Sequence, residues 1–422
     1  MSDVPTGSVG LAVEGSPGDG DRLWSPQFVL LLVSAMFMYL MTFMLTPTLP
    51  LFAEGLGAHA AAVGGLIVAV YTAGSLLPRL LWGRLVDGWG RRRVYVSGVV
   101  LMTVLSPLYP VLGLFPALFV LRLVQGAGFS GASTAAATMA ADLVPARRRA
   151  EGMGYYALAN TLGMALGPNL GLSLRTLPGP PWLFLASAAF GLVSLAAIAA
   201  VRYESQRRRA GAIPASGPRP SDRGAAPGVR ERRGVIERSI LPVAVTALFV
   251  VAPYGALIAF VAVYGLQRGV DAIGLYFSVF AAALFVVRIG IGRLADRLGA
   301  VRVLVPALVL MIAGLLILGV AGDLTGFLAS AVVFGLGFGV ALPVLQSAAY
   351  TIAPRDRHGA ASATFMGAAD VAYGLGAIVL GVVAALVGFP IAFVGASLSV
   401  LVAIVLTLVP LRRTLERRSS GT

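Results

Sequence analysis

Asp370 is the acidic residue that lies deepest inside a long apolar run of this sequence. It is about 11 residues into the run 359–386, which at about 1.5 Å per helical residue puts it roughly 16 Å deep, near the middle of a hydrocarbon core about 30 Å thick. A carboxyl at that depth is costly, usually faces the protein interior, and can take up and release a proton. We predict that Asp370 takes up and releases a proton as part of the protein's working cycle. Glu54, near the end of the first apolar run, is the next candidate for this proton-coupling role. Two alternatives stay open, in which Asp370 pairs with a nearby Arg or binds a cationic ligand directly.

Arg122 is a second charge inside an apolar run, at 115–141. An Arg within a membrane helix costs about 2.5–3.5 kcal/mol on insertion scales, so it usually faces the protein interior and has a function. The alternative is an Arg near the end of its helix that extends to the membrane surface.

Twelve apolar runs must position these residues. Of the 422 residues, 58% are hydrophobic and only 12% are charged, against about 25% charged in an ordinary soluble domain. About 20 apolar residues suffice for a helix to cross a bilayer. The runs lie at 26–50, 62–82, 94–112, 115–141, 153–175, 181–202, 239–265, 271–292, 301–320, 324–349, 359–386 and 388–410. The sequence therefore predicts an all-α integral membrane protein of about twelve transmembrane helices.

The basic residues indicate how the chain crosses the membrane. All 32 are Arg, they give a formal net charge of +14, and they gather in alternate loops between the apolar runs. Such loops are cytoplasmic, so we expect a multi-pass protein of the cell membrane with both termini in the cytoplasm, and no nucleic-acid partner. The absence of Cys excludes disulfides and thiolate chemistry, and the absence of Lys excludes an ATP-binding P-loop.

The chain divides into two similar halves. A separation of 209 residues joins equivalent residues without a gap: Gly83 and Gly292, Asp87 and Asp296, Gly90 and Gly299, Arg79 and Arg288, Gly126 and Gly335, Gly167 and Gly376. We predict a disordered cytoplasmic tail at 1–24, six-helix halves at 25–202 and 239–411, an Arg-rich cytoplasmic linker at 203–238 and a tail at 412–422. Arg79 and Arg288 are expected to extend toward the cytoplasm or to pair with Asp87 and Asp296.

The turn after the second run resembles the loop signature of the major facilitator superfamily. It reads Gly83-Arg-Leu-Val-Asp87-Gly-Trp-Gly90-Arg91-Arg92, and Gly292, Asp296 and Gly299 form its weaker copy. The resemblance implies two pseudo-symmetric six-helix halves, a substrate site near the middle of the bilayer between them, and a role for these residues as a latch between conformations. Arg122 and Gly126 are similar to the second signature of the family, which assigns the Arg to proton coupling or substrate binding.

The fifth run carries Gly163, Gly167, Pro168 and Gly171, which resemble the signature of exporters in this family. Glycines four residues apart also allow any two helices to pack closely, so the pattern favours export without requiring it.

The remaining polar residues of the apolar runs could line a substrate cavity. They are Tyr39, Thr42, Gln125, Asn160, Tyr254, Gln346 and Tyr373. Since such a cavity is sparse in charge and rich in Ala, Gly, Met and Phe, it suits small amphipathic or hydrophobic molecules.

The resemblance and this cavity together predict a proton-coupled exporter, an antiporter that works by alternating access as a monomer. No cofactor or metal is expected, and no catalysis. The alternatives are a proton-coupled importer of a small polar metabolite, a sensor or scaffold that transports nothing, and an intramembrane serine protease built on Gly128-Phe-Ser130-Gly131. The protease would need a His near Ser130, and His59 and His358 are both expected in loops.

Overall fold

The computed structural model describes residues 23–57, 60–79, 81–82, 85, 89–112, 114–145, 148–178, 181–201, 237–288, 297–354 and 358–414. These residues form helices and no strand. In the first half the helices are α1 (Pro26–Leu45), α2 (Thr48–Gly55), α3 (Ala60–Leu76), α5 (Arg91–Leu105), α6 (Leu108–Leu112), α7 (Phe115–Leu143), α8 (Arg149–Arg175) and α9 (Trp182–Ala199). In the second half they are α11 (Leu241–Gln267), α12 (Gly274–Arg288), α14 (Ala300–Val320), α15 (Leu324–Ile352), α16 (His358–Val387) and α17 (Phe389–Leu406). Short helical turns lie at Arg238–Ile240, Asp271–Ile273 and Thr407–Leu411.

Each of the twelve predicted runs is helical over most of its described residues. Within the described residues, nine helical segments are both long enough and apolar enough to cross a membrane. The other three runs correspond to α3, α7 and α8, and α7 and α8 are the longer ones, with 29 and 27 residues. The all-α fold is confirmed, while the count of twelve membrane crossings stays a prediction.

Two predicted spans are broken by proline. The run 26–50 divides into α1 and α2 around Pro47, and the run 94–112 divides into α5 and α6 at Pro107. Proline lacks the backbone N–H that a helix needs and its ring collides with the preceding turn. The apolar pattern continues through both breaks, so hydropathy alone predicts a single helix in each place.

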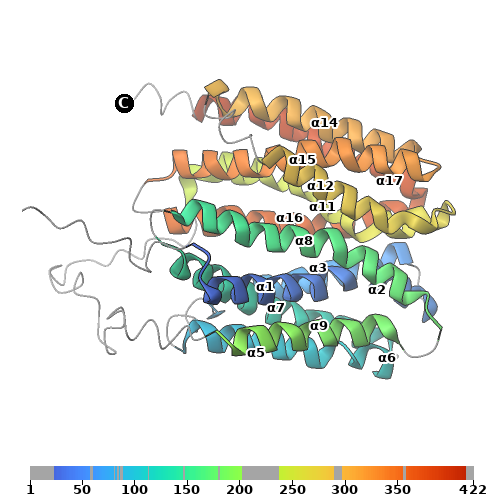
Figure 1. Cartoon of the computed structure of the whole chain (residues 1–422). Coiled ribbons are helices and arrows are strands. Elements are labelled where there is room, and N and C mark those ends of the chain that lie inside the picture. Colours follow the sequence, from blue (N-terminus) through green and yellow to red (C-terminus); the bar gives the residue numbers. More distant parts are fainter. Residues whose placement is uncertain are drawn as a thin grey trace, which may run out of the picture.

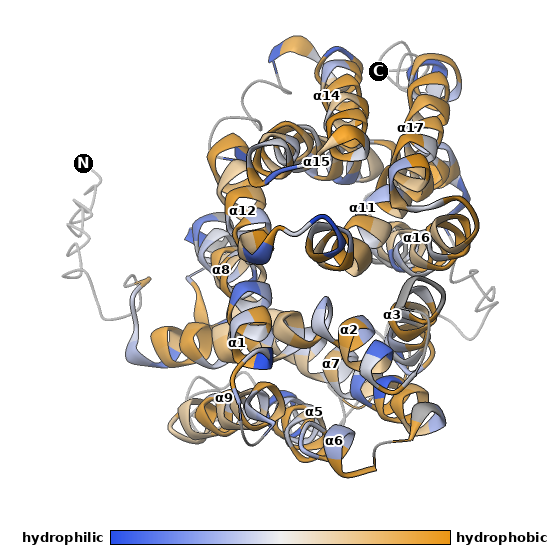
Figure 2. Ribbon diagram, turned by 90° about the vertical axis from the view of Figure 1, so that its right-hand side faces the viewer, coloured by the Kyte–Doolittle hydropathy of each residue, from blue (hydrophilic) through white to orange (hydrophobic). Residues whose placement is uncertain are grey.

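The two halves pack against each other through two equivalent pairs of helices. Helix α3 contacts α16, and α8 contacts α12. A shift of 209 residues carries α3 onto α12 and α8 onto α16, so the second contact repeats the first. Figure 1 shows the helices running side by side, and the end-on view in Figure 2 shows α8 next to α12 and α3 next to α16.

Glycines bring helices together inside each half. A Cβ added to Gly167 of α8 would lie 2.9 Å from the Met44 backbone nitrogen of α1, and Gly163 and Gly171 face the same helix. The equivalent Gly376 of α16 lies against the Ala252 backbone of α11. The glycine pattern of the fifth run is therefore a packing surface in this structure, and Pro168 lies within the same helix.

A valine at Gly167 is expected to separate α8 from α1. Adding atoms to a tightly packed contact costs about 1–3 kcal/mol, so the Gly167→Val variant should unfold at a lower temperature in detergent. Thermal unfolding monitored by circular dichroism measures this. Gly154→Val is the matched control, because a Cβ at that exposed position of α8 meets nothing within 4 Å. Equal midpoints for the two variants would contradict the close contact.

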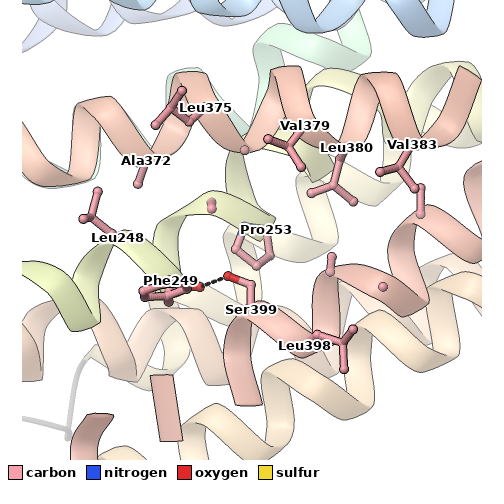
Figure 3. Close-up of a pocket in the computed structure, with 15 residues that line it drawn as sticks. Leu248, Phe249, Pro253, Ala372, Leu375, Val379, Leu380, Val383, Leu398 and Ser399 are labelled. Carbon is pink, nitrogen blue, oxygen red and sulfur yellow. Dashed lines mark hydrogen bonds between the residues drawn. The ribbon is translucent and has the colours of Figure 1, made fainter. Parts of the chain in front are cut away.

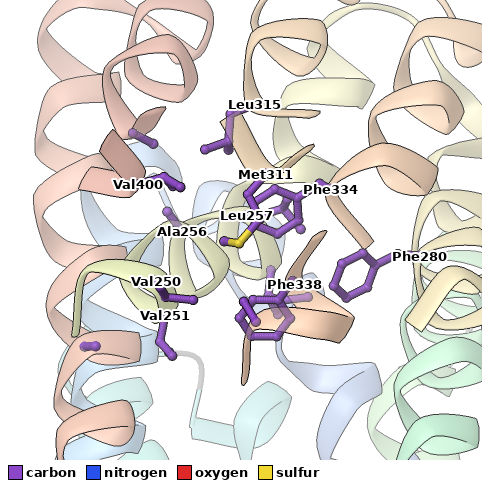
Figure 4. Packing of buried hydrophobic residues seen from close by; sticks show 14 of the residues in the cluster. Val250, Val251, Ala256, Leu257, Phe280, Met311, Leu315, Phe334, Phe338 and Val400 are labelled. Atoms are coloured by element: carbon purple, nitrogen blue, oxygen red, sulfur yellow. The ribbon is translucent and has the colours of Figure 1, made fainter. Parts of the chain in front are cut away.

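The apolar core of the second half is rich in aromatic rings. Phe334 and Phe338 of α15 stack at 6.1 Å between ring centroids, and Phe280 of α12 lies 6.1 Å from Phe334. Figure 4 shows these rings around Met311 and Leu257. The Tyr254 ring of α11 stacks on Phe338 at 4.3 Å, so this core leads directly to the surface between the halves.

The halves also meet at one end of the bundle. A Cβ added to Gly64 of α3 would lie 2.8 Å from the Phe260 ring of α11, and Gly274 of α12 lies as tightly against Asn169 of α8. Leu51 and Leu172 of the first half are buried in the apolar cluster of the second. The interface between the halves is closely packed at this end, where the connecting loops carry few Arg.

Candidate functional site

A cavity of about 220 Å³ lies between the two halves. The first half lines it with Phe43, Thr46, Val68, Tyr71, Thr72, Ser75, Arg79, Arg122 and Phe129, and the second half with Tyr254, Asp370 and Tyr373. Asp370 is 12 residues from the start of α16, a rise of about 18 Å, so the cavity lies near the middle of the helices. This is where the sequence predicted a substrate site.

Arg79 and Asp370 form an ion pair across the cavity. The Arg79 Nη1 atom lies 2.5 Å from the Asp370 Oδ2 atom, and about a third of each side chain is exposed. Arg79 follows α3 of the first half and Asp370 belongs to α16 of the second, so the pair bridges the two halves. Arg79 thus has a partner in the opposite half. Asp87, the partner that the sequence suggested, lies outside the described residues, so that pairing stays a prediction.

The equivalent place on the other side of the bundle carries no such pair. A shift of 209 residues relates Arg79 to Arg288 and Asp370 to Thr161. The Thr161 hydroxyl donates to the Ala157 carbonyl of its own helix at 3.0 Å. The ion pair is therefore specific to the contact between α3 and α16.

Arg122 is buried, with 1% of its surface exposed. Its Nη1 donates to Gln125 Oε1 at 3.3 Å, and its guanidinium carbon lies 4.8 Å from the centre of the Tyr71 ring. Its Nε has no hydrogen-bond partner among the described residues, and none of their carboxylates pairs with it. The alternative in which Arg122 extends to the membrane surface is wrong for this structure. A buried cation that has no carboxylate partner in the described part of the chain instead faces the cavity.

Two of the seven predicted polar residues line the cavity, Tyr254 and Tyr373. The other five lie elsewhere. The Tyr39 hydroxyl forms a hydrogen bond with Tyr156 at 2.9 Å, and Asn160 lies beside it. The Thr42 hydroxyl donates to the Met38 carbonyl, and Gln125 accepts from the Tyr109 hydroxyl at 2.9 Å. Gln346 is a half-buried residue of α15. Glu54, the second choice for proton coupling, is exposed on α2 and does not line this cavity.

One polar stripe, which begins on α3 and continues into the residues after it, was not predicted from the sequence. Tyr71, Ser75 and Arg79 line the cavity together, and they are spaced four residues apart. Residues at that spacing lie on one side of a helix, so a search for polar stripes in the second run would have found them. The short hydroxyl and aromatic side chains gave too weak a signal among apolar neighbours.

Only part of the predicted latch falls within the described residues. Gly90 and Gly299 both have positive φ, at 106° and 85°, which permits the sharp turn before α5 and before α14. Arg91 forms an ion pair with Asp142, and Arg92 donates to the Ala199 carbonyl at 2.9 Å, so both hold together elements of the first half. The other four latch positions, Gly83, Asp87, Gly292 and Asp296, lie outside the described residues.

Ser130 of the protease alternative is fully buried inside α7. Its Oγ has no hydrogen-bond partner among the described residues, so no described group activates it as a nucleophile.

A second cavity, of about 520 Å³, lies on the opposite side of α11 and α16 (Figure 3). Pro253 and Ala372 line it, whereas their neighbours Tyr254 and Tyr373 line the cavity between the halves. No charged side chain is among its lining residues.

Sequence comparisons place these features in a known context. The family model described as Major Facilitator Superfamily matches residues 31–290 and 245–422. The chain is 30% identical over 215 residues to the rat MFS-type transporter SLC18B1, an alignment that covers 48% of this chain and 47% of that one. It is 27% identical over 143 residues to multidrug resistance protein 3 of Bacillus subtilis strain 168, covering 34% and 28%. The chain thus spans under half the length of these curated relatives.

The fold matches solved transporter structures over nearly the whole chain. A bacterial homolog of the human lysosomal transporter Spinster, in an inward-facing and unoccupied conformation, superimposes with a TM-score of 0.75 at 15% identity, covering 93% of this chain and 97% of that one. Two helical halves, a central cavity between them and the family match lead to one conclusion. This chain belongs to the major facilitator superfamily and is a multi-pass membrane protein.

Proposed function

We propose that this protein is a proton-coupled exporter of small amphipathic or hydrophobic molecules, an antiporter that works by alternating access. It acts as a monomer in the cell membrane, with both termini in the cytoplasm. The observation that carries the proposal is the Arg79–Asp370 ion pair, because it joins the two halves through a group that binds a proton.

The coupling follows from the charge of Asp370. When this carboxylate is ionised, its attraction to Arg79 favours the contact between α3 and α16. Protonation removes the attraction and lowers the free energy needed to separate the two helices. A proton thus changes the balance between two conformations without touching the substrate, which is what coupling by alternating access requires.

The lining of the cavity supports the substrate class. Apart from Asp370 and the two Arg residues, the lining consists of Val68, five aromatic rings of which three belong to Tyr, and three Ser or Thr side chains. Such a surface binds flat apolar groups with few directional hydrogen bonds. Multidrug resistance protein 3 is similar to this chain over part of its length, which also favours export of varied compounds.

Transport by the purified protein in liposomes tests the proposal. An amphipathic fluorescent dye should be moved against its gradient when a pH difference is imposed. Protons should cross the membrane in the direction opposite to the dye. A transporter-like scaffold would give no flux in either direction. Dye flux that ignores the pH difference would rule out the proton coupling.

Import together with a proton is a second candidate, favoured by the excess of positive charge. The described residues that line the cavity include two guanidinium groups and one carboxylate. Protonation of Asp370 makes this cavity more positive, so an anionic substrate and a proton would strengthen each other's binding, as symport requires. Affinity measured against pH separates the two candidates, since protons weaken substrate binding in an antiporter and strengthen it in a symporter.

A further inference from the structure

The second cavity is a groove formed by three helices of the second half. Leu248, Phe249, Ala252 and Pro253 of α11 line it, with Ala372, Leu375, Gly376, Val379, Leu380 and Val383 of α16 and Ala392, Gly395, Ala396, Leu398 and Ser399 of α17. Along α16 it runs from Ala372 to Val383, about 16 Å. That is about half of a hydrocarbon core of roughly 30 Å, the depth of one leaflet.

Small residues open this groove, and at three of these positions the first half carries larger ones. The residues equivalent to Ala392, Pro253 and Ser399, 209 positions earlier, are Leu183, Met44 and Phe190. Leu183 and Met44 are buried in one apolar cluster and Phe190 packs against it. At these three positions the internal repeat thus serves as a reference in which larger side chains occupy the corresponding space.

Ser399 is the one polar side chain among the lining residues of the groove, and its hydroxyl already donates a hydrogen bond. Pro253 has no N–H, so the Phe249 carbonyl loses its helical partner. The Ser399 hydroxyl donates to that carbonyl at 2.8 Å, as Figure 3 shows. Polar ligands therefore gain nothing here, and the residues at the outer edge, Leu375, Val379 and Leu398, are exposed and apolar.

We propose that this groove binds one acyl chain of a bilayer lipid. Three observations select that occupant. The groove lies among apolar helices long enough to span a membrane, its lining is apolar apart from Ser399, whose hydroxyl is already bonded, and its length matches one leaflet. Unlike the cavity between the halves, it has no charged group that would recognise a transported ion or a polar head group.

A photoactivatable phosphatidylcholine with a diazirine in its acyl chain tests the proposal in liposomes containing the full chain. After illumination, mass spectrometry maps the lipid adducts. We expect severalfold more label on the α16 and α17 segments that line the groove than on the equivalent α8 and α9 segments of the first half. Equal labelling of the two halves would overturn the proposal, because ordinary boundary lipid contacts both.

Gly395→Leu is designed to fill the groove. A Cβ at Gly395 meets nothing within 4 Å, so the larger side chain should enter open space and leave the fold intact. Its groove labelling should fall to the level of the first half, while Gly154→Leu, at an exposed position of α8, should label like the unaltered protein. Ala392→Leu, which restores the residue of the first half, provides a second filling variant if Gly395→Leu folds poorly. Undiminished groove labelling in a folded filling variant would also overturn the proposal.

Discussion

Replacement of Asp370 by Asn is expected to abolish transport driven by a pH gradient. Asn keeps the size of the side chain but carries no proton to exchange, so accumulation of dye in liposomes should fall to the level of liposomes without protein. Substrate binding should survive, because the aromatic lining of the cavity is unchanged. Dye flux under an imposed pH difference and equilibrium dye binding, measured on the same preparation, check both expectations.

The matched control separates proton coupling from a purely structural ion pair. Asp370→Asn alone leaves the Arg79 guanidinium without its partner, and an unpaired charge in a low-dielectric site is destabilising. The double variant Arg79→Gln with Asp370→Asn removes both charges. If the single variant failed only because Arg79 was left unpaired, the double variant would regain driven transport, and the coupling role would have to be given up.

Replacement of Arg122 by Gln is expected to lower the transport rate by roughly tenfold to a hundredfold. The change removes a buried charge that bonds Gln125 and lies over Tyr71, and a hydrogen bond to a charged group contributes about 1.5–3 kcal/mol. Because Arg122 lines the cavity, the loss should fall on transport more than on folding. Initial rates of dye flux, compared with the thermal midpoint of each variant, separate the two effects.

Arg175→Gln is the control for this change. Unlike the buried Arg122, Arg175 is exposed and lies in the last turn of α8. Its variant should transport like the unaltered protein. Equal losses in both variants would mean that overall positive charge, and not the position of Arg122, determines the rate.

The fold could be predicted from the sequence almost completely, because long apolar runs identify membrane helices. The observed helices begin and end within a few residues of the predicted runs in most places. The breaks at Pro47 and Pro107 were missed because apolar residues continue on both sides. The pairing of α3 with α16 and of α8 with α12 did not follow from hydropathy at all, since helices that are apolar on every side give no sign of which neighbour they face.

The site could be predicted only where a residue was costly. Asp370 and Arg122 could be identified because burying a charge in the membrane costs free energy, so such residues usually have a function. Both line the cavity. Uncharged polar residues carry no such cost. Tyr39 and Gln125 form hydrogen bonds with partners within the first half. Tyr71 of α3 and Arg79, which follows that helix, line the cavity instead, in a polar stripe of only three residues.

The apolar clusters have a consequence for how the chain is made. Within the described residues, two clusters consist entirely of residues 23–201. The third belongs to the second half but also includes Leu51, Val68, Met164 and Leu172 of the first. A ribosome adds about 5–20 residues per second and domains usually fold in the order of their synthesis. The first half can therefore complete its own core in the membrane while α11 to α17 are still being made, and it then offers the second half a finished surface on which to assemble.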